Sequence, residues 1–230
     1  MQNRRTFLGS AAAAGVGAAV GGSLFLPTSL PHAQAHAVTD PVMAELQKQL
    51  ADTVIAIRKG RGKAGEHARR IAGHVRLLNA HGVAAAADAQ LRRLLRQEGR
   101  DALLAREIDP KMLAAEMKAI GIERPPTFSA TYADRALMLD ATITHGMAAT
   151  LTAISARFDE IAPVLDRHAV TTVAVRQDGD ECWQWLIFLT NLESVSWEWC
   201  VLNPMLCSLF IGFYYAWASF MCALGCLCIV

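Results

Sequence analysis

Residues 132–161 read YADRALMLDATITHGMAATLTAISARFDEI, and this stretch decides the fold class. Apolar residues recur along it at steps of three and four, the spacing that places side chains on one face of an α-helix. These residues are Tyr132, Ala136, Leu139, Ile143, Met147, Leu151, Ile154, Phe158 and Ile161. We expect one long central helix of about 45 Å, bent at Gly146 and ended by Pro163. A single helix cannot bury this stripe alone, so the sequence predicts an all-α fold, a helical bundle.

Shorter helices are expected before the long one. Apolar residues at helical spacing, glycines that interrupt the pattern and an acid placed before a proline mark their limits. Gly82 stands where a C-terminal cap is expected, and Asp109 precedes Pro110 at the start of another helix. The predicted helices cover 41–58, 65–80, 83–97 and 109–121.

Charge and composition divide the chain after these helices. Residues 38–176 carry 20 Lys or Arg against 16 Asp or Glu, whereas residues 177–230 carry five acids and no base. All six cysteines and all five tryptophans lie after residue 180. The sequence therefore predicts a helical body over 38–176 and a separate tail over 177–230. The net charge of +1 gives no reason to expect a nucleic-acid partner.

The tail ends in a long apolar run. Residues 206–230 contain 25 consecutive residues without a charge, and a helix of about 20 such residues can cross a bilayer. Small residues recur within the run at steps of three and four, which suits close helix packing in membranes. Together with the tryptophan-flanked segment 182–202, this predicts a membrane-associated helical hairpin whose partner is membrane lipid or a membrane protein.

Two alternatives for the tail stay open. Polar residues alternate with tryptophan in 183–185 and 197–199, which would suit a β-hairpin. The second alternative is an unusually apolar core element that packs on the helical body.

The first 37 residues have the layout of a removable export signal. Arg4 and Arg5 precede Phe7, Leu8 and a weakly apolar stretch rich in alanine and glycine. Patterns of the A-x-A type that end at Ala35 and Ala37 provide cleavage sites. The segment 3–9 resembles the twin-arginine motif of exported bacterial proteins, although Asn3 and Gly9 depart from it. The resemblance implies the Tat translocase as a partner, and export of a folded chain to the periplasm, the periplasmic membrane face or the medium.

Export changes how the cysteines are interpreted. Their number is even, and an oxidising compartment permits disulfides, although six cysteines allow 15 pairings. Free, buried cysteines are the alternative, and the spacing lacks the C-x-x-C pairs of a zinc site. The candidates for disulfides are Cys182, Cys200, Cys207, Cys222, Cys226 and Cys228.

Histidines are the remaining candidates for metal chemistry. His67, His74 and His81 recur every seven residues, about 10 Å apart along a helix, which is too far for one shared ion. We expect a solvated, weakly basic helix face there. His145, next to Gly146, is expected to favour a helix end. The sequence contains none of the common nucleotide, haem or nucleophile motifs, so it identifies no catalytic residue and no cofactor.

These features predict an exported, membrane-attached helical protein with a binding or structural role and no assigned ligand. A soluble, secreted, disulfide-stapled helical protein is the first alternative. The second is a periplasmic protein that carries a cofactor or a metal.

Overall fold

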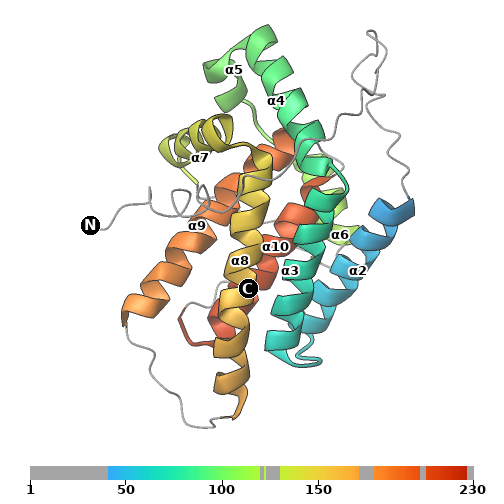
Figure 1. Cartoon of the computed structure of the whole chain (residues 1–230), viewed down its shortest axis with the longest axis vertical. Helices are drawn as coiled ribbons and strands as arrows, with labels where there is room; N and C mark the ends of the chain where they lie inside the picture. Colours follow the sequence, from blue (N-terminus) through green and yellow to red (C-terminus); the bar gives the residue numbers. More distant parts are fainter. Residues whose placement is uncertain (1–40, 120–121, 123–129, 171–178, 203–205, 227–230) are drawn as a thin grey trace.

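The computed structural model describes residues 41–119, 122, 130–170, 179–202 and 206–226. Within these ranges every regular element is helical, so the predicted all-α class is confirmed (Figure 1). The helices are α2 (Pro41–Arg58), α3 (Ala64–Ala80), α4 (Val83–Glu98), α5 (Arg100–Leu104), α6 (Pro110–Ala119), α7 (Tyr132–His145), α8 (Met147–Val170), α9 (Gly179–Leu202) and α10 (Cys207–Ala223).

The shorter helices follow the signals in the sequence. The predicted helices 41–58, 65–80 and 83–97 match α2, α3 and α4 to within one residue at either end. Gly82 separates α3 from α4 with a φ of 73°, a left-handed conformation that glycine adopts without steric cost. At the start of α6 the Asp109 carboxylate accepts a hydrogen bond from the backbone N–H of Lys111, at 2.9 Å.

The expected long helix is instead two helices, α7 and α8. Gly146, with φ 82° and ψ 159°, lies outside helical geometry and separates them. The break shifts the face that α7 buries, because Met138, Leu139 and Thr142 point inward there. Two members of the predicted stripe, Tyr132 and Ile143, are 53% and 46% exposed. The stripe is therefore confirmed along α8 and wrong along part of α7.

Pro163 also acts differently from the prediction, because α8 continues through it to Val170. Proline inside a helix removes a backbone hydrogen bond and costs about 3 kcal/mol. Around it Ile161, Ala162 and Leu165 are at most 2% exposed, so tight packing offsets this cost. The closest packing is against α3, where a Cβ added at Gly65 would lie 2.6 Å from the carbonyl oxygen of Ala162.

Helices α9 and α10 complete the core around α8. Phe158 of α8 is fully buried and lies in edge-to-face contact with four aromatic rings of α9 and α10. The ring-centroid distances are 5.2–6.4 Å, to Phe188, Phe213, Trp217 and Phe220. In Figure 1, α10 lies among α8, α9 and α2. One hydrophobic cluster runs through helices on both sides of the predicted boundary near residue 177.

The prediction of a tail separate from the body is therefore corrected. Small residues in the charge-free run serve packing inside the protein: a Cβ at Gly212 would lie 3.4 Å from Cδ2 of Leu50 in α2. Tryptophans expected at a membrane interface are mostly internal, since Trp185, Trp197 and Trp199 are at most 8% exposed. Trp183 is 63% exposed. The β-hairpin alternative is wrong because residues 179–202 form α9.

The predicted transmembrane helix is not found either. Among the described residues, no helix has both the length and the apolar character needed to cross a membrane. Within the charge-free run the helix α10 has 17 residues and ends at Ala223.

We expect Phe158→Ala to lower the free energy of unfolding by about 3–5 kcal/mol, because it removes the ring shared by three helices and leaves a cavity. Glu160→Ala is the matched control on the exposed side of the same helix turn. It removes only an exposed ion pair with Arg157 and should change stability by about 0.5 kcal/mol or less. Chemical denaturation of both variants measures the difference, and equal losses would contradict the assigned core.

Removing residues 178–230 tests whether the tail is a core element. The truncated chain loses the aromatic partners of Phe158 and the α10 surface that covers Leu50. Apolar burial contributes about 25 cal/mol per Å², and a domain is stable by only about 5–15 kcal/mol. The stabilisation lost with the apolar area that α9 and α10 bury exceeds that margin. We expect aggregation or non-cooperative melting in circular dichroism and sedimentation. A cooperatively folding truncated chain would show that the body is independent of the tail.

Candidate functional site

Two of the three histidines expected on a solvated face of α3 are buried. His67 is 6% exposed and His74 is 5% exposed. The His67 ring nitrogen Nε2 lies 2.5 Å from the carbonyl oxygen of Arg61, which links the α2–α3 loop to the helix. The solvated face is therefore wrong at these two positions, because α3 packs against both α2 and α8.

The other two candidate histidines are exposed. His81 follows the last turn of α3, and His145 is the last residue of α7. Within the described ranges, no three or more His, Cys, Asp or Glu side chains are grouped so that they could hold a metal ion.

A shallow hollow of about 500 Å³ lies over the exposed side of α3. Its lining combines cationic and apolar side chains with one glycine of the helix interior. Gln49 of α2 lines it together with Arg70, Gly73, His74, Arg76, Leu77 and Ala80 of α3. Of these seven residues, only His74 was a candidate from the sequence.

The charges around the hollow are unevenly compensated. Arg76 donates to Ser155 at 3.0 Å and to the Asp159 carboxylate at 2.5 Å, so its charge is paired with α8. Arg70, in contrast, makes no ion pair within the part of the chain that the structure describes. Burial, and then the nearby Arg70 charge, lower the pKa of His74, which keeps its ring neutral. The hollow therefore carries about one uncompensated positive charge.

A second polar group lies deep in the core, where α9 meets α7. Glu198 is 2% exposed, and its Oε2 accepts a hydrogen bond from the Thr142 hydroxyl at 3.0 Å. Its Oε1 has no hydrogen-bond partner within the described part of the chain. Burial, together with the charge of Asp88, raises the pKa of Glu198 to about 8, and the Thr142 hydrogen bond acts in the opposite direction. At neutral pH Glu198 is therefore a neutral carboxylic acid.

Asp88 connects this group to the break between α7 and α8. Its Oδ1 accepts a hydrogen bond from the backbone N–H of Met147, at 2.9 Å, and so caps α8 from α4. A Cβ at Gly146 would lie 3.2 Å from Asp88 Oδ2, so the positive φ and the limited space both favour glycine there.

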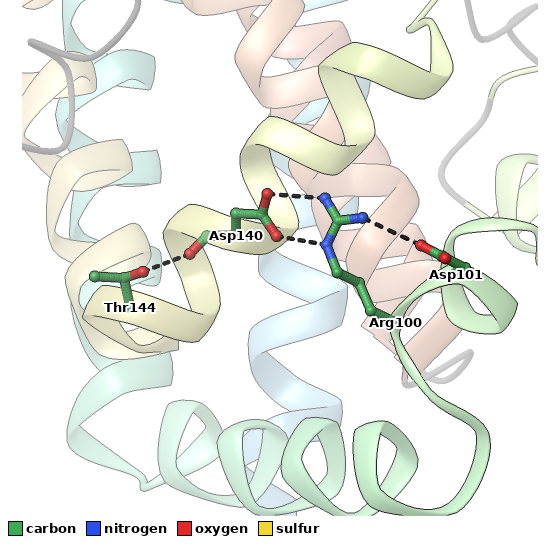
Figure 2. Close-up of polar contacts among 4 residues, drawn as sticks. All are labelled: Arg100, Asp101, Asp140 and Thr144. Atoms are coloured by element: carbon green, nitrogen blue, oxygen red, sulfur yellow. Dashed lines mark hydrogen bonds and ion pairs between the residues drawn. The ribbon is translucent and has the colours of Figure 1, made fainter.

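Helix α7 is held at its outer side by a bidentate ion pair (Figure 2). Arg100 of α5 donates from Nε and Nη2 to the two carboxylate oxygens of Asp140, at 2.7 and 2.8 Å. The hydrogen bonds and charge of Arg100 lower the pKa of Asp140. Asp101 accepts a longer bond from Nη1 of Arg100, and the Thr144 hydroxyl donates to the Asp140 backbone carbonyl. This exposed cluster positions α7 and leaves His145 outside it.

The cysteines form disulfides, as one of the two interpretations of the sequence predicted. Cys182 pairs with Cys226 and Cys200 pairs with Cys207. The bonds join the two ends of α9 to the opposite ends of α10, which therefore run antiparallel. Cys222 is also disulfide-bonded.

Several predicted residues lie outside the described ranges. They are Arg4, Arg5, Phe7 and Leu8 of the signal motif, Ala35 and Ala37 at the cleavage sites, and Cys228.

Neither Glu198, which is buried, nor Asp88, which is half-buried, was predicted from the sequence. A signal for Glu198 did exist. It stands in an apolar segment of 54 residues without a single Lys or Arg, so a carboxyl buried there has no cation in its own segment. For Asp88 the sequence contains no comparable signal, because its partner Met147 is 59 residues away.

Comparison of the chain with protein families, curated proteins and solved structures finds no match.

The raised pKa of Glu198 predicts a pH-dependent stability. The folded state holds this proton between the ordinary carboxyl pKa of 4.5 and about 8, whereas the unfolded state has released it. The stability that this bound proton provides is therefore fully present below pH 4.5 and is lost as the pH rises to about 8. Within this window the free energy of unfolding falls by about 1.4 kcal/mol per pH unit.

Glu198→Gln keeps an acceptor for Thr142 and cannot ionise. We expect its unfolding free energy to vary less between about pH 5 and 8 than that of the natural chain, by denaturant titration at several pH values. Glu160→Gln, at an exposed position, is the control and should keep the natural slope. Equal slopes in all three proteins would contradict a neutral Glu198.

Proposed function

We propose that this chain is an exported helical binding protein that works, with its disulfides formed, outside the cytoplasm. The observation that carries the proposal is the pair of disulfides, Cys182–Cys226 and Cys200–Cys207. Such bonds form and persist in oxidising compartments and are rare in the cytoplasm. They indicate an oxidising environment outside the cell's reducing interior.

The leader supplies the proposed route. Arg4 and Arg5 resemble the twin-arginine motif, whose translocase would be the export partner. Because α9 and α10 belong to the core, the chain cannot complete folding before they are available, which suits a pathway that carries folded proteins. In this proposal the disulfides form after export and join helices that have already packed.

The binding role rests on how the polar residues are distributed. Arg70, which has no ion-pair partner among the described residues, lies beside an open hollow, where a ligand can reach it. Glu198, by contrast, is enclosed in the core. An accessible cation on a rigid helix, next to apolar surface, is an arrangement suited to holding a ligand in place.

Changing Arg4 and Arg5 together to Lys should stop export, because lysine keeps the charge and loses the planar guanidinium group. We expect the variant to accumulate in the cytoplasm with its cysteines reduced. Cell fractionation combined with thiol alkylation measures both properties.

The matched control changes Arg92 and Arg93, an exposed pair on α4, to Lys. This chain should be exported and oxidised like the natural one. If the Arg4/Arg5 variant is also exported and oxidised normally, the proposed route is wrong.

A further inference from the structure

Glycine 73 lies in the middle of α3, where glycine costs about 0.5–1 kcal/mol relative to alanine. At the other helical glycines whose surroundings the structure describes, close approach of a second helix explains the glycine. Gly65 allows α3 to approach Ala162, and Gly212 allows α10 to approach Leu50. Among the residues that the structure describes, a Cβ at Gly73 would meet no atom within 4 Å. Close packing inside the protein therefore gives no reason for a glycine at this position.

Gly73 lies among the residues of α3 that line the hollow, one turn from both Arg70 and Leu77. Leu77 is a large apolar side chain that is 44% exposed, and Ala80 extends the apolar surface one turn further. Any larger side chain at position 73 would project into the space that these residues surround.

We propose that the hollow over Gly73 binds a small molecule that carries a carboxylate next to an apolar chain. Arg70 would hold the carboxylate, since its planar guanidinium matches a carboxylate with two parallel hydrogen bonds. The apolar chain would lie over Gly73 and against Leu77 and Ala80. This inference rests on the proposed binding function and names the ligand class for it.

The charge balance favours a carboxylate over a phosphate. Asp159 offsets Arg76, and the His74 ring is neutral, so Arg70 supplies about one net positive charge. A carboxylate carries a single negative charge, whereas a phosphate monoester carries about −1.5 to −2 at pH 7. The apolar surface next to the cation also suits an amphipathic ligand better than a free inorganic anion.

Calorimetric titration of the full, oxidised chain with sodium octanoate tests the proposal. We expect saturable binding of octanoate. Acetate and inorganic phosphate should bind more weakly because they lack the apolar chain, and octylamine should bind more weakly because it lacks the negative charge. Arg70→Gln should weaken octanoate binding about tenfold or more, the loss expected for a hydrogen bond to a charged group. Arg93→Gln, which removes an exposed arginine on α4, is the control and should bind normally.

Gly73→Leu separates a binding role from a structural one. Leucine favours helix more than glycine does, and the open space accepts it, so the melting temperature should stay the same or rise. Octanoate binding should nevertheless be lost, because the side chain fills the hollow. The proposal is overturned if octanoate fails to saturate, if phosphate or acetate binds as tightly, or if Gly73→Leu and Arg70→Gln bind like the natural chain. These outcomes leave the export result of the Arg4/Arg5 variant unaffected, so the two proposals fail independently.

Discussion

The burial of Phe158 is the contact on which the other packing depends. Its ring lies in α8, and the four aromatic rings around it come from α9 and α10. Helix α8 also packs along α3, so the same helix organises the earlier and the later parts of the chain. Because an aromatic side chain of this size buries a large area, neither part can complete its core without the other. Continuity of the core, more than any local propensity, explains why the apolar tail lies inside.

The disulfides act on a pair of helices that packing has already brought together. Ser196 of α9 donates to the backbone carbonyl of Phe210 in α10, and Trp217 of α10 donates to that of Trp185 in α9. Cys182 and Cys226 are 44 residues apart, so their bond removes much more freedom from the unfolded chain than the bond between Cys200 and Cys207, which are 7 apart. The long-range bond closes the larger loop and so contributes more entropic stabilisation than the short one, which joins the end of α9 to the start of α10.

The sequence predicted the early helices well because local signals determine their ends. Gly82 and the Asp109-Pro110 step act within a few residues, so no tertiary information is needed. Gly146 was predicted only to bend a helix, because its separation of α7 from α8 depends on Asp88, a residue far away in the chain. The charge-free run was misassigned for a related reason. A core helix and a membrane helix have the same composition, and only the partner surface, here Leu50 and Val54 of α2, distinguishes them.

The candidate site was harder to predict than the fold, because its character depends on which charges are left without partners. The sequence shows many arginines in 38–176, but it does not show that Arg76 pairs with α8 while Arg70 faces open space. The histidine repeat predicted a solvated, weakly basic face on α3, which the structure corrects: burial keeps His74 neutral, so the ring does not supply the charge. The same reasoning applies to Glu198, whose ionised form is negative. Its segment contains no cation, so the buried carboxyl loses its charge by protonation. The acidic tail is therefore compatible with its place in the core.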